Sequence, residues 1–146
     1  MLKNKIALIT GASRGIGKAI AIEFAKNNAK VIINYYYNKD EAEDVVEKIK
    51  KHGVESMAIK ADVANFDEVK QMADEIQKKF GKVDILVNNA GIVKDRTLKN
   101  MSLDEWNAVI NTNLNAVFYV TKLILPLMGE GGRIINISSI VGQYGI

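Results

Sequence analysis

The sequence predicts an α/β fold built around a doubly wound parallel sheet of about five strands. Short runs rich in β-branched residues alternate with stretches of helical periodicity along the whole chain, which is typical of βαβ units. The first run is followed at once by a glycine-rich turn, TGASRGIG over residues 10–17, and then by a helical pattern. No linker, internal repeat or low-complexity stretch interrupts this pattern. We therefore expect residues 1–146 to form one domain.

Five apolar runs have the length and composition of buried strands. The expected strands are Lys5–Thr10, Lys30–Tyr35, Glu55–Lys60, Val83–Asn88 and Arg133–Ser138.

Four amphipathic segments lie between these strands, and each should bury one apolar face. The residues expected to face inward are Ile16, Ile20 and Phe24 in the first helix; Ala42, Val45, Val46 and Ile49 in the second; Val69, Met72, Ala73, Ile76 and Phe80 in the third; and Trp106, Val109, Ile110, Leu114, Val117 and Phe118 in the fourth. Asn65 should cap the third helix and Gly81 should end it, while Ser102 and Glu105 form a capping box for the fourth.

Asn113 falls on the inward stripe of the fourth helix. An amide there must be hydrogen-bonded, because a buried unpaired polar group costs about 1–3 kcal/mol. Two interpretations stay open. The amide either fixes packing within the core, or it, or a backbone kink at this position, is directed at a site beyond the strand ends.

Composition narrows the function classes. The chain of 146 residues is 48% hydrophobic and 25% charged, with a formal charge of +3 and no cysteine. Disulfides, thiol nucleophiles and cysteine metal sites are therefore excluded, and no metal site or nucleic-acid partner is expected. The only histidine, His52, stands at a helix end beside Gly53. No signal peptide is visible, and the apolar run Leu123–Met128, broken by Pro126, is too short to span a bilayer, so we expect a cytoplasmic protein.

The glycine-rich turn has the spacing G-x-x-x-G-x-G, a variant of a dinucleotide-binding fingerprint. Gly11 would permit a tight turn after the strand, Gly15 would let the backbone approach a pyrophosphate, and Gly17 would let the helix pack close to the sheet. The backbone N–H groups at the helix start would then face a phosphate. The alternative is a turn with a purely structural role.

The end of the second strand indicates which dinucleotide would bind. An NAD site usually has an acidic residue there to accept hydrogen bonds from the ribose 2′-OH. This chain instead has Asn34, Tyr35 and Tyr36, and the nearest acid, Asp40, belongs to the start of the next helix. With Arg14 adding positive charge in the glycine-rich turn, the sequence predicts NADP(H) over NAD(H). The tyrosines could instead pack at the strand end.

Further polar residues follow the third, fourth and fifth strands, where an open α/β sheet binds its ligand. They are Asp62 and Val63, the segment Asn88–Gly91, and Ser138 with Ser139. Asp62 could instead start a helix, and Asn88 and Asn89 could simply bond neighbouring strands. The serines could reach a substrate by hydrogen bonding, but a serine nucleophile is not expected because the only histidine is distant in the chain.

The ordered motifs TGASRGIG, ADV, NNAG and INISS resemble those of the short-chain dehydrogenase/reductase family over the whole chain. The resemblance implies a doubly wound Rossmann sheet that binds NADPH and an enzyme that reduces a carbonyl, such as that of a 3-oxoacyl thioester. The residues implied for the cofactor site are Gly11, Ala12, Ser13, Arg14, Gly15, Ile16, Gly17, Tyr36, Asp62, Val63, Asn89, Ala90 and Gly91.

Two catalytic residues are implied by the same resemblance. Asn113 would hold a water in a proton relay, and Ser139 would polarise the substrate carbonyl. The family's Tyr-x-x-x-Lys pair should follow the serine by roughly a dozen residues, beyond Ile146, and Tyr144 stands too close to Ser139 to take that role. The C-terminal part of the family fold is therefore expected to be missing. The alternatives are a dinucleotide-binding or self-associating module without turnover, and a sugar or polyol dehydrogenase.

The same expectation affects the last strand. Without a further strand, Arg133–Ser138 would be a bare edge carrying Ile134, Ile135 and Ile137. Long apolar edges invite pairing with another chain. We therefore expect a homo-oligomer that associates through this edge, or marginal stability.

Overall fold

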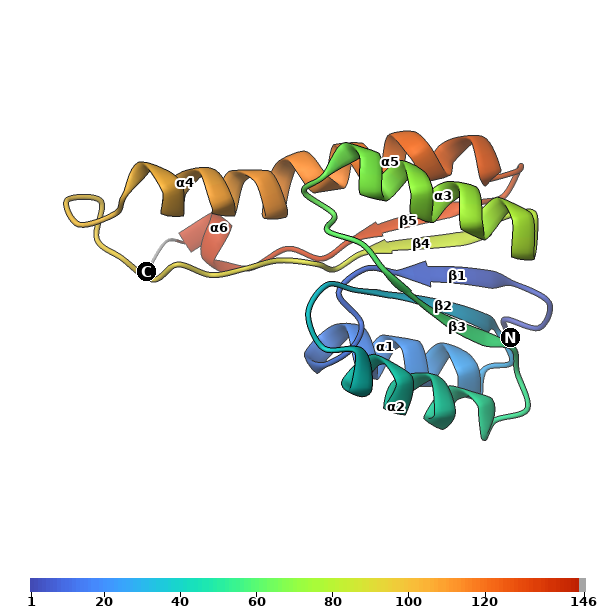
Figure 1. Cartoon of the computed structure of the whole chain (residues 1–146). Coiled ribbons are helices and arrows are strands. Elements are labelled where there is room, and N and C mark those ends of the chain that lie inside the picture. The colour runs from blue at the N-terminus through green and yellow to red at the C-terminus, as the bar shows by residue number, and fades with distance from the viewer. Residues whose placement is uncertain (145–146) are drawn as a thin grey trace.

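A computed structural model describes residues 1–144 of the chain. Five parallel strands form one sheet in the order β3-β2-β1-β4-β5 (Figure 1). The strands are β1 (Ile6–Ile9), β2 (Lys30–Tyr35), β3 (Ser56–Lys60), β4 (Ile85–Asn88) and β5 (Arg133–Asn136). The strand order reverses at β1, which confirms the doubly wound parallel sheet and creates a crevice beyond the carboxyl ends of β1 and β4. Each strand lies within its expected range and is at most two residues shorter at either end.

Helices cover both faces of the sheet. The elements are α1 (Gly15–Lys26), α2 (Lys39–Lys50), α3 (Phe66–Phe80), α4 (Leu103–Ile110), the π-helical turn η1 (Asn111–Asn115), α5 (Ala116–Ile124), the 3₁₀ turn η2 (Leu125–Leu127) and α6 (Val141–Tyr144). Figure 1 shows α1 and α2 on one face, and α3 with α5 on the other. The described part of the chain is thus a three-layer α/β/α unit.

The expected helix caps are confirmed. The Asn65 side chain accepts hydrogen bonds from the N–H groups of Asp67 and Glu68, at 3.0 and 3.3 Å, and begins α3. Ser102 and Glu105 form the complete capping box of α4. Gly81 ends α3 in the left-handed conformation, with φ of 75°. These local signals fixed the helix ends because each satisfies backbone groups that would otherwise lack a partner.

The expected inward face of α1 is confirmed for Ile20 and Phe24, which are partly buried against the core cluster, but it is wrong for Ile16. Its fully buried residues are Gly17, Ala21 and Ala25, whereas Ile16 is 63% exposed. The large side chains alone predicted the inward face. The positions nearest the sheet carry small residues, because α1 packs close to the glycine-rich turn and the sheet and a larger side chain would not fit there. The expected inward faces of α2 and α3 are confirmed, except that Phe80 is only partly buried.

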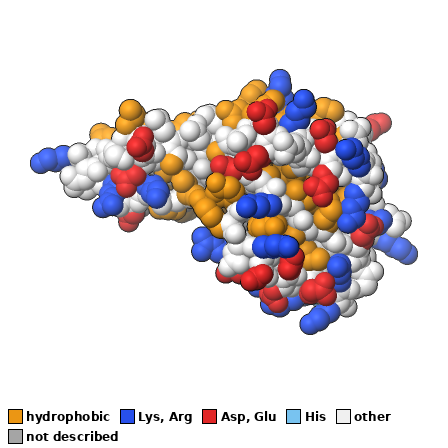
Figure 2. Space-filling model, viewed as in Figure 1, with side chains coloured by type: hydrophobic (Ala, Val, Ile, Leu, Met, Phe, Trp, Pro, Cys, Tyr) orange, Lys and Arg blue, Asp and Glu red, His pale blue; other side chains and the backbone are white. Residues whose placement is uncertain are grey.

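The expected inward stripe of the fourth helix is wrong at three of its six positions, while Val109, Ile110 and Val117 are half-buried. Trp106, Leu114 and Phe118 are about half exposed or more, and the buried residues are Ala116, Val120 and Ile124. Figure 1 shows that α4 extends past the ends of the strands, so no sheet lies beneath it. The π turn η1 then shifts the helical phase before α5 reaches the sheet. Figure 2 shows hydrophobic side chains at the surface of this upper helical layer.

The run from Leu103 to Leu127 is one continuous helical segment of 25 residues, and an 18-residue window within it has a mean hydropathy of 1.2 with 17% of that window buried. By length and composition alone it could cross a membrane, so the short run Leu123–Met128 does not decide this question. A helix that packs on a sheet by one face can have the same composition.

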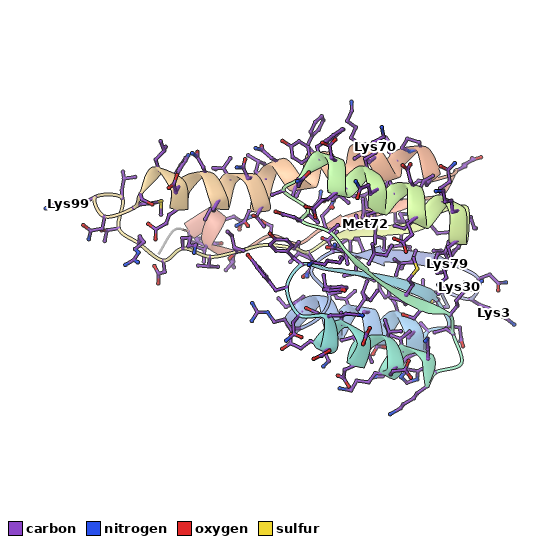
Figure 3. The ribbon with its side chains drawn as sticks, in the orientation of Figure 1. Lys3, Lys30, Lys70, Met72, Lys79 and Lys99 are labelled. Carbon is purple, nitrogen blue, oxygen red and sulfur yellow. The ribbon has the colours of Figure 1, made fainter. Side chains whose placement is uncertain are left out.

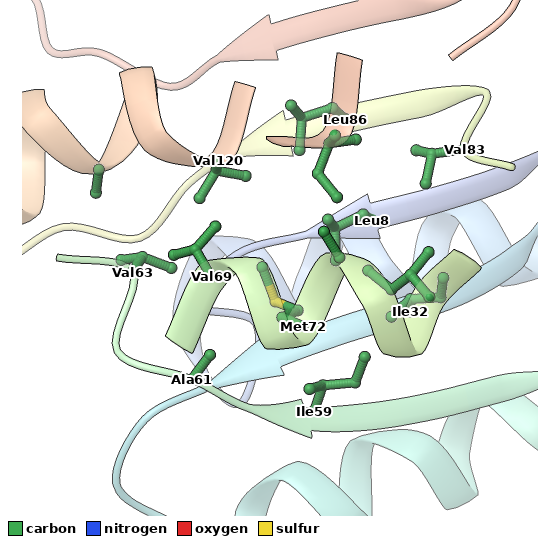
Figure 4. Close-up of a cluster of buried hydrophobic side chains, with 14 of the residues drawn as sticks. Leu8, Ile32, Ile59, Ala61, Val63, Val69, Met72, Val83, Leu86 and Val120 are labelled. Atoms are coloured by element: carbon green, nitrogen blue, oxygen red, sulfur yellow. The ribbon is translucent and has the colours of Figure 1, made fainter. Parts of the chain in front are cut away.

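Two hydrophobic clusters stabilise the fold, one on each face of the sheet. In the first, Leu8, Ile32 and Leu86 of the strands pack against α3 and α5, and Met72 of α3, labelled in Figure 3, is 1% exposed. Figure 4 shows this cluster. In the second, Ile9 and other strand residues pack against α1 and α2. Burying each large aliphatic side chain contributes about 1.5–3 kcal/mol.

Asp84 links β1 to β4 at the amino-terminal ends of these two strands, opposite the crevice. Its carboxylate accepts a hydrogen bond from the Ile6 N–H at 2.9 Å and from Lys82 Nζ at 3.1 Å, with Lys5 Nζ 3.7 Å away. Burial opposes its ionisation, but the hydrogen bond from Ile6 and the two lysines hold the pKa of Asp84 below its ordinary value. In its charged form, the Asp84 carboxylate therefore holds the start of β1 beside the start of β4.

Candidate functional site

The glycine-rich turn joins β1 to α1 at the crevice. Gly11 and Gly15 have φ of 61° and 58°, a left-handed conformation that strains any residue with a Cβ. Arg14 is the N-cap residue of α1 and makes no side-chain capping bond. The first N–H groups of α1 have no partner within the helix. They form a positively polarised end that can bind an anion.

Gly17 has no space for a side chain. A Cβ there would lie 2.5 Å from Asn89 Nδ2, 2.7 Å from the Gly11 carbonyl oxygen and 2.9 Å from Ala12 Cα. A Cβ on Gly11 would lie 2.8 Å from Ala90 Cα. The turn is therefore packed directly against the segment that follows β4.

Hydrogen bonds join these two segments. Thr10 Oγ1 accepts from the N–H groups of Asn89 and Ala90, both at 3.0 Å. Asn89 Nδ2 donates to the carbonyl oxygens of Thr10 and Gly11, at 2.9 and 3.1 Å. The Asn89 amide therefore bonds the glycine-rich turn itself. The structure therefore favours the interpretation in which Asn89 bonds a neighbouring strand, because its partners lie directly after β1.

Asn34 positions the glycine-rich turn, a role that its place at a strand end did not predict. It is 2% exposed, and its Oδ1 accepts from the Gly11 N–H at 3.2 Å while its carbonyl accepts from the Ala12 N–H at 2.9 Å. Its Nδ2 donates to the Ala61 carbonyl at 3.0 Å. A buried polar residue at the end of an apolar strand must find such partners, and this was the available signal for Asn34 and also for Thr10.

Tyr36 and Asp62 lie near one another at the ends of β2 and β3. The Asp62 carboxylate is the main cause of a raised pKa of the Tyr36 phenol, and the neighbouring Tyr37 adds to it. Tyr36 is 41% exposed, and its ring centroid lies 4.2 Å from that of Tyr37. Tyr36 is therefore not a core residue, whereas Tyr35 is 7% exposed and packs in the core as the strand-end alternative expected.

Asp62 also shapes the turn into α3. Its Oδ1 accepts from the Ala64 N–H at 2.9 Å, and its own N–H donates to Glu68 Oε2 at 2.7 Å. Val63 beside it is 5% exposed and packs in the core. Ala12 in the glycine-rich turn is fully buried. These two predicted site residues can face a ligand only through their backbone, whereas Arg14 and Ile16 have exposed side chains and Ser13 is half-buried.

Asn113 lies in the π turn η1 beside the segment after β4. Its Oδ1 accepts from the Ile92 N–H and its Nδ2 donates to the Ile92 carbonyl, both at 2.8 Å. A Cβ on Gly91 would lie 3.4 Å from Asn113 Oδ1. Asn113 is exposed rather than buried, so the expectation of a core amide is wrong. The backbone irregularity is present, and the side chain of Asn113 holds the loop.

Ser139 follows β5, so it lies at the carboxyl ends of the strands, as the glycine-rich turn does. The Ile137 N–H donates to the Asn88 carbonyl at 2.9 Å, so the chain continues alongside β4 for one residue beyond β5. Ser139 is exposed, and its Oγ accepts from the Val141 N–H at 3.2 Å at the start of α6. Asn88 is instead structural, because its Nδ2 donates to Asn136 Oδ1 at 2.8 Å across the two strands.

The structure thus gathers the glycine-rich turn and residues 89–91 into one packed unit, with Asn113 next to it. Tyr36 and Asp62 lie at the neighbouring strand ends. Within residues 1–144 no group of three or more acidic or histidine side chains could hold a metal ion.

Residues 5–146 match the family described as short chain dehydrogenase. A 3-oxoacyl-[acyl-carrier-protein] reductase FabG of Staphylococcus epidermidis is 54% identical over 97% of this chain and 59% of that protein. A 3-oxoacyl-[acyl-carrier-protein] reductase of Synechocystis is 47% identical over 99% of this chain and 59% of that protein. Among solved structures, a short chain dehydrogenase from Burkholderia cenocepacia in complex with NADP has a TM-score of 0.96 at 39% identity, covering 99% of this chain and 59% of that one.

The chain therefore spans about 59% of the length of these relatives. Since the family match extends over nearly all of its residues, the chain belongs to the short chain dehydrogenase family.

Proposed function

We propose that this chain binds NADP(H) at the glycine-rich turn and is the cofactor-binding part of a carbonyl reductase. The observation that carries the proposal is the turn itself. The start of α1 has no side-chain cap, Gly15 is left-handed and in open space, and Gly17 has no room for a Cβ. Such a backbone surface fits a diphosphate. The NADP complex of the similar Burkholderia cenocepacia protein supports the assignment.

The proposed cofactor residues divide by the groups they would offer. Gly11, Ala12, Gly15, Gly17, Val63, Ala90 and Gly91 would offer backbone atoms, and Ser13, Arg14, Ile16, Tyr36 and Asp62 would offer side chains. Asn89 would act by holding the turn, since its Nδ2 already donates to two carbonyls of that turn.

NADP(H) is favoured over NAD(H) by charge. Within residues 1–144 no carboxylate lies within 4 Å of the Arg14 guanidinium, whereas the nearby Lys18 is paired with Asp44 at 3.3 Å. No acidic residue stands at the end of β2, where it would repel a 2′-phosphate; the first acid, Asp40, lies in α2. Arg14 is the candidate for binding that phosphate.

For the reaction, we propose reduction of the keto group of a 3-oxoacyl thioester, by analogy with the similar reductases. When bound, the reduced nicotinamide supplies a hydride equivalent. The Ser139 hydroxyl would donate a hydrogen bond to the substrate carbonyl oxygen, which stabilises negative charge developing there. Asn113 would hold the loop after β4 and, through the irregular backbone of η1, a water for proton transfer.

A second candidate is a dinucleotide-binding module without turnover. It is favoured by the exposure of Ser139. A sugar or polyol dehydrogenase is a further alternative within the family. We also propose that residues 1–146 act as one domain, in the cytoplasm, without nucleic acid or membrane as partner.

We further propose that the chain self-associates. The edge strand β5 carries Ile134 and Ile135, which are 39% and 42% exposed. Leu114 and Phe118 add a second exposed apolar surface on the upper helices. A monodisperse monomer with a cooperative melting transition would contradict this proposal.

The main test measures binding and turnover separately. NADPH fluorescence should increase on titration with the chain, and NADPH oxidation should then be followed with acetoacetyl-CoA. Binding with turnover supports the reductase, and binding without turnover supports the module. Absence of NADPH binding to the folded chain would overturn both.

A further inference from the structure

A groove along the free edge of β3 has no role in the site described above. β3 is the outermost strand on its side of the sheet, and Figure 1 shows α2 on one face and α3 on the other. A cavity of about 410 Å³ opens between these helices. Its floor is formed by Ser56, Met57 and Ala58, and Val46 of α2 and Lys79 of α3 contribute to its walls. Cavities of this size hold small ligands or peptide segments.

The backbone of β3 presents unpaired groups to this groove. The Val31 N–H donates to the Glu55 carbonyl, and the Ala61 N–H donates to the Tyr35 carbonyl, both at 3.0 Å. The odd-numbered residues of this segment therefore direct their backbone N–H and carbonyl groups toward β2. Alternate residues of a parallel strand turn their backbone groups to opposite sides. Residues 56, 58 and 60 therefore direct their N–H and carbonyl groups away from the sheet. Their two-residue spacing matches the backbone of another strand.

A side chain also lacks a partner there. Ser56 is 6% exposed, and its Oγ makes no hydrogen bond within residues 1–144. Buried hydroxyl groups are normally paired. Because the Oγ has less than 1 Å² of accessible surface, an occupant with a polar atom near Ser56 would satisfy this hydroxyl once the side chain turns toward the groove.

The charges around the groove favour an acidic occupant. Glu43 and Glu47 of α2 are already paired, with Lys39 at 3.4 Å and Lys50 at 3.3 Å. Lys79, labelled in Figure 3 near the end of α3, has no carboxylate within 4 Å among the described residues.

Lys60 at the carboxyl end of β3 likewise has no carboxylate partner in the part of the chain that the structure describes. Figure 2 shows acidic and basic side chains interspersed with hydrophobic ones on this face. Among the charged residues that line the groove, Lys79 alone has no opposite charge within 4 Å in the part of the chain that the structure describes, so the uncompensated charge of the lining is positive.

We propose that this groove binds an extended acidic polypeptide segment, which adds a strand to the free edge of β3. Such strand addition combines backbone hydrogen bonds with pockets for alternate side chains. Ala58 packs with the cluster on the α2 face, and Met57 packs with the cluster on the α3 face. The segment would place small polar side chains toward Ser56 and acidic ones toward Lys79. This site does not depend on the proposed dinucleotide site.

The test uses the 146-residue chain and a blocked seven-residue peptide of alternating threonine and glutamate, followed by amide chemical shifts. The amides of Ser56, Ala58 and Lys60 should shift, and a peptide with lysine replacing glutamate should bind at least about fivefold more weakly. Ala58→Pro should abolish binding, because it removes an outward N–H without removing a bond to β2.

Charge reversal supplies a matched pair of variants. Lys79→Glu should weaken binding of the acidic peptide about fivefold, whereas Lys78→Glu, in the same turn but outside the groove, should change it less than twofold. Melting curves and NADPH titration check that each variant is folded, and they report on the dinucleotide site separately.

Equal binding of the lysine peptide, or binding by Ala58→Pro equal to that of the unmodified chain, would overturn the proposal. So would a dimer that forms without peptide and is lost in Ala58→Pro, because the groove would then belong to a second copy of the chain.

Discussion

Replacing Gly17 with alanine tests whether the glycine-rich turn is fixed by its contact with Asn89. The new Cβ would lie 2.5 Å from Asn89 Nδ2, 2.7 Å from the Gly11 carbonyl oxygen and 2.9 Å from Ala12 Cα. Two of these three atoms belong to the backbone and cannot rotate away. The Asn89 amide must therefore move, or the turn must open.

The size of the effect follows from these contacts. Displacing Asn89 Nδ2 removes its bonds to the carbonyls of Thr10 and Gly11, each worth about 0.5–1.5 kcal/mol. Overpacking adds about 1–3 kcal/mol. Alanine recovers up to about 1 kcal/mol of helix propensity. We expect the free energy of unfolding of Gly17→Ala to fall by about 2–4 kcal/mol, and Tm by about 4–16 °C at about 2–4 °C per kcal/mol.

The assay combines thermal unfolding with NADPH titration. The Kd for NADPH should rise at least about tenfold, because loss of 1.4 kcal/mol of binding free energy suffices. Gly129→Ala is the matched control, since a Cβ there meets nothing within 4 Å and φ is not positive. This control should melt and bind as the unmodified chain does. If Gly17→Ala behaved like the control, the argument from close packing would be refuted.

Three further substitutions test other parts of the structure. Asp84→Asn should lower the free energy of unfolding at pH 7 by about 1–2 kcal/mol through its weakened bond with the Ile6 N–H. Because the pKa of Asp84 is lowered on folding, this difference in urea titrations should fade as the pH falls below about 4 and through the folded-state pKa; a pH-independent difference would contradict it. Asn113→Ala should speed hydrogen exchange of the Ile92 amide about fivefold or more, and unchanged exchange would show that the amide does not hold the loop. Arg14→Ala should raise the Kd for NADPH about tenfold or more while changing the Kd for NADH less than twofold, and equal loss for both would refute its role at the 2′-phosphate.

Local signals predicted most of the fold. The strands were recognisable because each is a short apolar run, and the caps at Asn65 and Ser102 because a side chain satisfies specific N–H groups. The expected inward stripe of the fourth helix failed, because the burial of a side chain depends on whether the sheet lies beneath it. Trp106 and Phe118 form an apolar stripe, but α4 runs past the strand ends and the π turn changes the helical phase. A periodicity read from sequence assumes a regular helix above a continuous sheet.

The site was predicted in its location but less well in how its residues act. The glycine spacing identified the turn, since glycine adopts the left-handed conformation of Gly11 and Gly15 without the strain that a Cβ brings. The contribution of Asn34 was missed, because its partner on the turn is the Gly11 N–H, 23 positions away in the chain. Contacts over such separations cannot be inferred from spacing.

The asparagines show why motif residues need not touch a ligand. Asn89 uses its Nδ2 on the turn, and Asn113 uses both its Oδ1 and Nδ2 on Ile92. Both N–H groups of Asn89 Nδ2 are used on the turn, so binding a ligand through that nitrogen would require those bonds to break. Asn113 spends one N–H and one lone pair on Ile92, which leaves one donor and one acceptor site on its amide. Thr10 adds two further bonds to the segment after β4. The backbone N–H groups at the start of α1 are therefore held in place before any ligand arrives, and a preorganised site loses less conformational entropy on binding.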